Sequence, residues 1–550
     1  MRNPGHDTAH VSAPTLSIGD ADLRLLARPA SIVLAFGLLL YLAATWHSYG
    51  IGPDEPQRQA YGRLLLDFYQ SGLVDTVQLQ RAGTIAGGGL FDLLTAALEP
   101  IWPGPVWDLR HLVSGLFGLG GMLAAWRLAR LLGGEAAALL AVVILALTGA
   151  WSGALFTHTA EIPQAACMSW ALYFLTRLSV DLPRLAPSHA FGFAFSTGAA
   201  LAIGDSAWLM PICLLLCLLV AARRDRQAGS RFGHWLLALL PGVAIAAGLM
   251  WLGRPALLTG LAGTGPGAVV PTLVDGSLLF SNEVPRSYLH DYLVVKLPEL
   301  MLIGLGLALG GRPWRPAEAP ARVAERRAQT RRGSSLHLPL ALAIGLPIAF
   351  AWLTRPALAD GLRQFLFLLP PLAVASALGW RMFWQALRGN PAAAWLIAAI
   401  VGLLVAIHTT TLAHLQPYGH VFYNSLAGGL RGAAGSWVLD YNASSLREDV
   451  DMLERYTGLA GTPSTARPAG AVAVLICGDV VQARSALPPP FVPTRDPALA
   501  RFAIVASQPG CPASGQGEVI HSVIRRGVVL GQLLDLRVRG DSLPPAAHRD

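Results

Sequence analysis

Long apolar runs alternate with polar segments along most of the chain, and the spacing of these runs indicates the fold class. Most runs are close to the roughly 20 residues that an α-helix needs to cross the hydrocarbon core of a bilayer. The pattern therefore predicts a polytopic α-helical membrane protein of about eleven spans. The expected spans are residues 31–46, 108–132, 136–152, 162–180, 188–204, 205–222, 234–252, 289–311, 337–354, 363–384 and 392–414.

The stretch 188–222 admits two interpretations. A single long helix would put Arg223 and Arg224 on the outer side. Two short spans, broken at Gly204–Asp205, put them on the inner side together with the arginine-rich loop 312–336. Because cytoplasmic loops carry an excess of arginine and lysine, we expect two spans, each near the lower length limit of about 17 residues.

This topology separates the polar segments into two groups. The tail 1–30 carries Arg24 and Arg28 just before the first apolar run, as in a signal anchor, so we expect it in the cytoplasm. The transmembrane domain is expected over residues 31–414. Its outer face would receive segments 47–107, 153–161, 253–288 and 355–362, and also everything after residue 414.

Residues 415–550 differ from the rest of the chain. Short apolar runs at 470–479 and 500–507 are typical of buried strands, and 527–538 is typical of a terminal strand or a hairpin. Proline- and glycine-rich turns separate these runs. Segment 437–456 begins as a loop and ends as an amphipathic helix, for which Ser445 is a candidate N-cap. We therefore expect a small extracytoplasmic, periplasmic α/β domain.

Composition narrows the class of function. The chain is 53% hydrophobic and only 13% charged, with a net charge of +8. Its basic residues are arginines that flank apolar runs, and Lys296 is the sole lysine. This distribution fits anionic lipid headgroups better than nucleic acid. The sequence contains no phosphate-binding loop and no dinucleotide glycine fingerprint, which argues against a soluble nucleotide-using enzyme.

Cys477 and Cys511 lie in the polar C-terminal region, whereas the other cysteines lie in apolar runs. If the C-terminal region is exported, these two cysteines could form a disulfide, and the sequence leaves this open.

Acidic residues follow the expected spans on the outer side. Asp54 and Glu55 come just after the first span, and Glu161 opens the fourth. A carboxylate at a bilayer face loses hydration unless water, a cation or a polar substrate replaces it. These acids are therefore candidate catalytic groups. The alternatives are a polar loop cap for the first pair and favourable helix-dipole placement for Glu161.

Cations also gather at the expected outer face. Arg286, Lys296 and Arg363 lie at or near the outer ends of two spans. Such a group would suit a lipid phosphate, because arginine and lysine both bind phosphate through charge-assisted hydrogen bonds. Ordinary interfacial anchoring explains each of them equally well when it is considered alone.

Several blocks together resemble bacterial membrane glycosyltransferases of the GT-C superfamily, in the branch of protein O-mannosyltransferases and aminoarabinose transferases. The last block is most similar to a poorly characterised branch. The blocks are DEPQRQAYGRLLLDFYQSG (54–72), GGGLFDLLTAALEPI (87–101), LRHLVSGLFGLGG (109–121), AEIPQAACMSWALYFL (160–175), YLVVKLPEL (292–300), DGLRQFLFLLPPLA (360–373) and the segment 416–448.

The resemblance implies transfer of a sugar from a polyprenyl-phosphate carrier to an envelope acceptor at the outer face of the inner membrane. It implies that Asp54 is the general base. Glu55 and Glu161 are further catalytic candidates, and Lys296 and Arg363 are our candidates for stabilising the phosphate leaving group. The remaining candidate substrate-binding residues are Arg286, Tyr61, Arg63, His158, Tyr418 and Tyr423. No cofactor is implied, although paired acids could hold a divalent cation through waters.

The sequence departs from the family pattern twice. Many relatives have an Asn-Pro-Lys-Asp-type run where this chain has THTAE (157–161), and a basic residue where it has Asp205 and Ser206. Two lost cations imply a different donor, a different carrier contact or an inactive enzyme. The alternative function is a non-catalytic protein that binds a polyprenyl phosphate or assists envelope assembly. A transporter is disfavoured because the spans carry no polar residues at their middle.

Overall fold

The structure is a computed structural model of the 550-residue chain. It describes residues 20–74, 88–182, 185–224, 232–255, 269–310, 336–387, 389–468, 470–511 and 517–537. Most of the expected cytoplasmic tail and nearly all of the expected inner loop 312–336 lie outside these residues.

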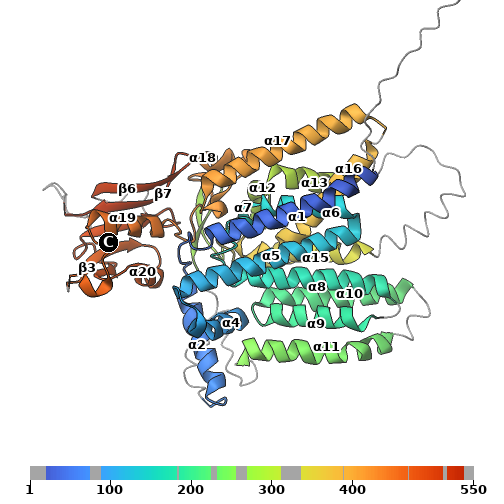
Figure 1. The fold of residues 1–550 in the computed structure, drawn as a ribbon, viewed down its shortest axis with the longest axis horizontal. Coiled ribbons are helices and arrows are strands. Elements are labelled where there is room, and N and C mark those ends of the chain that lie inside the picture. Colours follow the sequence, from blue (N-terminus) through green and yellow to red (C-terminus); the bar gives the residue numbers. More distant parts are fainter. Residues whose placement is uncertain are drawn as a thin grey trace, which may run out of the picture.

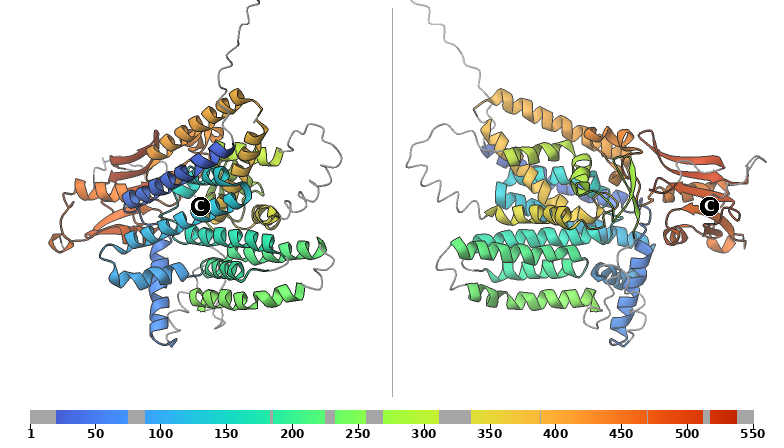
Figure 2. Two further views of the ribbon diagram at one scale, coloured as in Figure 1. Left: turned by 45° about the vertical axis from the view of Figure 1, so that its right-hand side comes forward. Right: turned by 180° about the vertical axis from the view of Figure 1, so that it is seen from behind.

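Helices occupy every apolar run predicted from the sequence, and they lie side by side in one bundle (Figures 1 and 2). They are α1 (Asp20–Thr45), α5 (Val106–Gly133), α6 (Glu135–Ala146), α7 (Gly149–Ser152), α8 (Glu161–Asp181), α9 (Pro187–Leu201), α10 (Leu209–Arg224), α11 (Phe232–Gly253), α12 (Tyr288–Lys296), α13 (Glu299–Gly310), α15 (Leu338–Thr354), α16 (Leu369–Ala386) and α17 (Pro391–Leu415).

The expected count of about eleven spans is not confirmed. Among the described residues, six helices are long and apolar enough to cross a membrane, or seven if the bent pair α12–α13 is one span. Helices α6 and α15 are apolar but shorter. The predicted break in 188–222 is confirmed, because α9 ends at Leu201 and a 3-10 turn, η2 (Asp205–Trp208), precedes α10.

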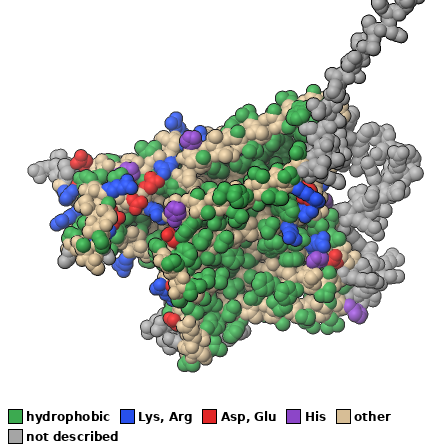
Figure 3. Space-filling model, viewed as in Figure 1, with side chains coloured by type: hydrophobic (Ala, Val, Ile, Leu, Met, Phe, Trp, Pro, Cys, Tyr) green, Lys and Arg blue, Asp and Glu red, His purple; other side chains and the backbone are tan. Residues whose placement is uncertain are grey.

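The helices differ strongly in how much of their surface the protein covers. In the apolar window of Arg363–Ala386, 78% of the residues are buried, whereas only 6% are buried in that of Pro391–Leu415. Helix α16 packs closely on α13, since a Cβ at Gly379 would lie 2.0 Å from the carbonyl oxygen of Gly304. Hydrophobic side chains cover the visible side of the bundle (Figure 3), as expected for a surface that faces lipid.

One end of the bundle carries the polar elements (Figures 1 and 2). These are α2 (Glu55–Gln70), α4 (Leu90–Leu98), η1 (Glu99–Ile101), a hairpin of β1 (Pro271–Val274) and β2 (Ser277–Phe280), η4 (Arg363–Leu368), η5 (Gly419–Val421), η6 (Ser425–Ala427) and α18 (Gly429–Ala433). Helix α2 is amphipathic: Leu65 and Phe68 are buried, while Arg63 points to solvent. The segments predicted to share one face therefore do gather at one end of the bundle.

The C-terminal part is a five-stranded sheet with helices packed on it, at the same end of the bundle. Its strand order is β4-β3-β5-β7-β6, with β3 parallel to β4 and β5, and β7 antiparallel to β5 and β6. The elements are α19 (Leu446–Tyr456), η7 (Ser464–Ala466), β3 (Val472–Cys477), α20 (Val480–Ala486), β4 (Phe491–Thr494), β5 (Phe502–Ala506), β6 (Glu518–Arg525) and β7 (Val528–Asp535).

The strands expected at 470–479, 500–507 and 527–538 are confirmed as β3, β5 and β7, whereas β4 and β6 were not predicted. Ser445 does precede α19, but its side chain does not cap that helix. The hydroxyl instead donates to the carbonyl oxygen of Leu530 in β7 at 3.1 Å. Tertiary contact with the sheet has therefore replaced the local hydrogen bond.

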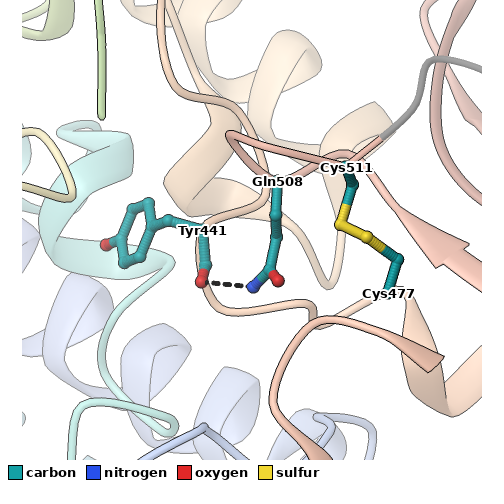
Figure 4. Close-up of a disulfide and its surroundings, with 4 residues drawn as sticks. All are labelled: Tyr441, Cys477, Gln508 and Cys511. Atoms are coloured by element: carbon teal, nitrogen blue, oxygen red, sulfur yellow. Dashed lines mark hydrogen bonds between the residues drawn. A yellow bond between two sulfur atoms is a disulfide. The ribbon is translucent and has the colours of Figure 1, made fainter. Parts of the chain in front are cut away.

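A disulfide joins Cys477 at the end of β3 to Cys511 in the loop after β5 (Figure 4). The same loop carries Gln508, whose side-chain amide donates to the carbonyl oxygen of Tyr441 at 2.8 Å. Gln482 in α20 donates to the carbonyl oxygens of Ile51 and Asn442, each at 2.7 Å. These contacts fix the sheet against the polar end of the bundle.

Candidate functional site

Three carboxylates from distant parts of the chain meet at the guanidinium of Arg363. Its Nε donates to Glu161 at 2.8 Å, one terminal nitrogen lies 3.4 Å from Asp360, and the other donates to Asp54. The predicted candidates Asp54, Glu161 and Arg363 are therefore brought together at the polar end of the bundle. Asp360 completes the group, which we call the Arg363 cluster.

Local structure explains how each acid reaches Arg363. Asp54 is the N-cap residue of α2, and Glu161 is the first residue of α8. Asp360 and Gly361 both have positive φ angles, 59° and 66°, which reverse the chain just before η4. The hydroxyl of Tyr288 accepts a hydrogen bond from the Gly361 amide at 2.9 Å and fixes this turn. Helix starts and a tight turn thus present all three acids at one end of the bundle.

The acids differ in exposure and in charge. The Arg363 guanidinium lowers the pKa of Asp54 against the opposing effect of burial. Burial disfavours the ionised form of Glu161, but the nearby guanidiniums, that of Arg363 above all and also that of Arg58, favour it, and the pKa is lowered to about 2. Burial raises the pKa of Asp360. The Asp54 side chain is 52% exposed, so it is the acid of this cluster most open to a reactant.

The lowered pKa of Glu161 predicts a stability contribution that depends on pH. A carboxyl whose pKa falls on folding stabilises the protein above its unfolded pKa, and this contribution is lost as the pH falls through the folded pKa. For Glu161 that window runs from about 4.5 down to about 2. We expect Glu161→Gln to lower the midpoint of thermal unfolding at pH 7, and the difference from wild type to shrink as the pH falls toward 3. A difference that stays constant between pH 7 and pH 3 would contradict this assignment.

Asp92 and two arginines form a second layer behind the cluster. Arg110 Nη2 lies 2.7 Å from Asp92 and 3.2 Å from Thr159, and Arg58 Nη1 lies 3.3 Å from the other carboxylate oxygen. Arg110 and Asp92 are almost fully buried. This layer ties α4 and α5 to the loop that leads into Glu161, and thereby orients that acid.

Asp92→Asn is expected to destabilise the protein by about 3 kcal/mol, because removing one partner leaves the buried Arg110 charge uncompensated. Denaturant unfolding in detergent micelles would measure the loss. Glu99→Gln is the matched control, since Glu99 pairs with Arg63, whose side chain is 59% exposed, and such pairs contribute about 1 kcal/mol or less. Equal losses in the two variants would contradict this role of Asp92.

Glu55 points away from its neighbour Asp54. It is 2% exposed, and its carboxylate accepts from the Gly52 amide at 2.7 Å and pairs with His111 at 3.1 Å. These contacts favour a positioning role, in which Glu55 shapes the turn that presents Asp54. The adjacent acids of the predicted catalytic pair therefore have different surroundings.

His158 lies next to the cluster and links it to the C-terminal segment. Its Nδ1 lies 3.0 Å from the Thr157 hydroxyl, and its Nε2 lies 2.8 Å from the hydroxyl of Tyr441. Burial lowers the pKa of His158 to about 3, so the ring is neutral at physiological pH. A neutral ring can accept or donate a proton but adds no charge to the site.

Tyr441 and Asp440 are site residues that sequence reasoning missed. Asp440 is fully buried, lies 3.0 Å from His420, and accepts from the amides of Ser444 and Ser445 at 2.9 Å each. This arrangement holds the loop that carries Tyr441 against His158. The signal in the sequence was the family-like block 416–448, which contains both residues.

Lys296 is buried and makes different contacts from those of Arg363. Its Nζ donates to the carbonyl oxygen of His420 at 2.8 Å and lies 3.8 Å from the ring centre of Tyr423. Tyr423 in turn donates to the carbonyl oxygen of Val438 at 2.6 Å. These contacts fasten α12 to the segment that follows α17.

The other predicted binding residues lie apart from the cluster's ion pairs. Arg286 stacks on Trp352 at 5.3 Å, and Arg63 pairs with Glu99 at 2.8 Å. Tyr61 is buried beside Gly89, where a Cβ would come within 2.6 Å of its ring. Tyr418 is buried beneath Arg525, at 4.7 Å. The structure therefore brings together Asp54, Glu161 and Arg363, with His158 beside them, but not these four residues.

Two arginines lie near the two positions, 157–161 and 205–206, where many GT-C transferases have a basic residue and this sequence has neither lysine nor arginine. Arg254, which follows α11, is mostly buried and pairs with Asp205. Arg58 of α2 contributes to the electrostatics of both Asp54 and Glu161. Neither arginine lies at the family's motif positions, so neither could be assigned from those motifs.

No group of three or more His, Cys, Asp or Glu side chains within the described ranges is arranged to hold a metal ion. At the Arg363 cluster the three carboxylates surround a guanidinium instead. The positive charge that balances them is therefore part of the chain.

Comparison with known proteins gives structural neighbours but no sequence relatives. No family model matches the chain, and no curated protein matches it. The chain is similar to ArnT from Cupriavidus metallidurans in the apo state, with a TM-score of 0.48, 15% identity and coverage of 94% of this chain and 100% of that one. It is also similar to the Archaeoglobus fulgidus oligosaccharyltransferase in the apo form, with a TM-score of 0.45, 15% identity and coverage of 87% and 65%.

Both likenesses extend over at least 87% of this chain.

Proposed function

We propose that the chain is a membrane glycosyltransferase. It transfers a sugar from a polyprenyl-phosphate-linked donor to an envelope acceptor at the outer face of the bacterial inner membrane. The observation that carries this proposal is the convergence of Asp54 and Glu161 on Arg363 at the polar end of an apolar helical bundle. These residues come from three separate blocks of the sequence that resemble the GT-C transferases.

Asp54 acts as the general base in this proposal. Its carboxylate accepts the proton of the acceptor hydroxyl while the oxygen of that hydroxyl forms a bond to the anomeric carbon of the sugar. The bond from that carbon to the carrier phosphate breaks, and the phosphate leaves with the electron pair. The half-exposed position of Asp54 and its lowered pKa support this role, because the group is both accessible and ionised at neutral pH.

Arg363 stabilises the departing phosphate, whose negative charge grows as the bond breaks. In the structure the guanidinium is shared by three carboxylates. A donor phosphate would compete with Asp54, the most exposed of these acids, for the same guanidinium. Asp54 released in this way becomes more basic, so donor binding would activate the base.

The proposal needs no cofactor. A divalent cation held through waters by Asp54 and Glu161 remains the alternative, and it would have to displace the guanidinium from these carboxylates. The disulfide supports an oxidising, extracytoplasmic location for the C-terminal sheet, since disulfides are rare in the cytosol.

Mass spectrometry of envelope lipids and glycans would test the proposal in intact cells. A strain that lacks the protein should lose the mass of one sugar from a defined envelope component, and the wild-type chain should restore it. The size of the missing mass identifies the sugar, and the altered component identifies the acceptor. An unchanged envelope, or a changed component without loss of a sugar mass, would contradict the glycosyltransferase assignment.

A further inference from the structure

A cavity of about 610 Å³ lies away from the Arg363 cluster, between the end of α17 and the segment that follows it. Ile407, Thr411 and Leu415 of α17 form one wall. Arg431 of α18 and Arg526 in the turn between β6 and β7 line the opposite side. Figure 1 shows these elements meeting at the polar end of the bundle.

Hydrogen bonds connect the polar groups that line this cavity. Arg526 donates to the Thr411 hydroxyl at 2.9 Å, and Arg431 Nε donates to the carbonyl oxygen of Arg526 at 2.8 Å. The Arg526 guanidinium is thus held by Thr411 of α17, and the Arg431 guanidinium by the backbone of Arg526. Both side chains remain exposed, so they can accept a further partner.

Among the described residues that line the cavity, Glu299 is the one carboxylate, and its oxygens already have hydrogen-bond partners. Glu299 accepts from the Ser425 amide at 2.7 Å and faces His408 Nε2 at 2.7 Å. The other ring nitrogen of His408 faces the carbonyl oxygen of Leu404 at 2.7 Å. The carboxylate of Glu299 is thus occupied by Ser425 and His408. The guanidiniums of Arg431 and Arg526 are the cationic groups of the lining that have no carboxylate partner among the described residues.

An apolar path leads from this cavity along the outside of α17. Leu396, Ile400, Leu403 and Ile407 recur at helical spacing and are 40–63% exposed. Helix α17 contributes few residues to the protein core, and its window is only 6% buried. A ligand with a charged head and an apolar tail would therefore match both parts of this surface at once.

We propose that the cavity binds the phosphate headgroup of an anionic phospholipid, whose acyl chains lie along the exposed face of α17. The two guanidiniums bind the phosphate oxygens, since arginine matches phosphate geometry through paired N–H donors. Thr411 lies at the outer end of α17, the depth at which headgroups meet the hydrocarbon region. A bound lipid would join α17 to the turn between β6 and β7, and so hold the C-terminal sheet on the bundle.

Native mass spectrometry of the full chain, mixed with equal amounts of phosphatidylglycerol and phosphatidylcholine, tests this site. We expect wild type to retain phosphatidylglycerol, and R431Q/R526Q to retain about 25-fold less of it, because each arginine near anionic lipid contributes roughly a factor of five. R431K/R526K should keep most of the preference. Arg355→Gln is the control, since this exposed arginine follows α15 and does not line the cavity.

If R431Q/R526Q does not fold, the variant Ile407→Trp tests the same cavity. Ile407→Trp fills the cavity from a half-exposed position and should lower phosphatidylglycerol retention without changing charge. The lipid site would be overturned by equal retention of the two lipids by wild type, or by undiminished retention in both variants. Displacement of phosphatidylglycerol by millimolar inorganic phosphate would also overturn it, because the cavity would then be a site for free phosphate.

Discussion

Asp54→Asn is expected to lower the turnover number by about two to four orders of magnitude, the usual contribution of a general base. The amide has the same shape as the carboxylate, and its oxygen can still accept a hydrogen bond from Arg363. It cannot take the proton of an acceptor hydroxyl. The fold should therefore persist while transfer nearly stops. The rate of sugar transfer to the acceptor, measured with protein of equal abundance, gives the result.

Glu55→Gln is the matched control for this experiment because it removes the adjacent acid. Glu55 is buried and engaged by Gly52 and His111, so its loss should reduce stability more than turnover. Full activity of Asp54→Asn together with an inactive, well-folded Glu55→Gln would move the role of base to Glu55. Loss of activity in both variants at wild-type stability would indicate that the two acids act as a pair.

The lowered pKa of Asp54 also predicts how the rate of transfer depends on pH. The pKa of Asp54 is lowered from 3.8, so the group is already ionised throughout the physiological range. Protonation of the base should therefore not limit wild-type transfer between about pH 5 and pH 8. A residual rate in Asp54→Asn that rises with pH would indicate that hydroxide or another base replaces it.

Much of the fold follows from the hydrophobic pattern. Continuous apolar runs predict helices well, because each run must satisfy its own backbone hydrogen bonds in lipid. The hydrophobic pattern did not distinguish the helices that are long enough to cross the membrane from those that are not, since α6 and α15 are apolar but short. In the C-terminal sheet, the buried strand β5 was predicted, whereas β4 at one edge and β6 at the other were not. Edge strands are half-exposed, so their sequences carry a less distinct signal.

Part of the candidate site was predicted from the family-like sequence blocks rather than from the hydrophobic pattern. Asp54, Glu161 and Arg363 were found because each lies in a sequence block that resembles one family. The blocks could not indicate that Arg363 contacts both acids and also Asp360, because the distance between segments depends on how the helices pack. Tyr441 was missed for the same reason, since only the folded chain brings its hydroxyl to His158.

Lys296 illustrates the limit of assigning chemistry from charge alone. A lysine near the outer end of an apolar span was a reasonable phosphate ligand from sequence. In the structure its ammonium group lies over Tyr423 and donates to a backbone carbonyl. The carbonyl that accepts this hydrogen bond belongs to His420, which is 124 residues away along the chain. The residues around Lys296 in the sequence therefore could not indicate its partners.

Arg363→Gln is expected to lower the turnover number by about two to three orders of magnitude, comparable to the loss of one preorganised donor at a developing negative charge. Unlike Asp54→Asn, it should also lower the free energy of unfolding, by about 1–3 kcal/mol. The reason is that Asp54, Glu161 and Asp360 would then repel one another without a cation between them. Transfer rates and denaturant unfolding in micelles would measure the two effects separately. Arg63→Gln, on the neighbouring helix, should change stability by less than about 1 kcal/mol.

The double variant R363Q/E161Q separates the structural part of this effect from the chemical part. Removing one carboxylate relieves the repulsion that Arg363→Gln creates, so stability should recover toward the wild-type value. Turnover should remain low, because no cation is restored for the departing phosphate. Recovery of both properties would mean that Arg363 only balances charge. Recovery of neither would mean that Glu161 contributes to transfer and to folding independently of Arg363.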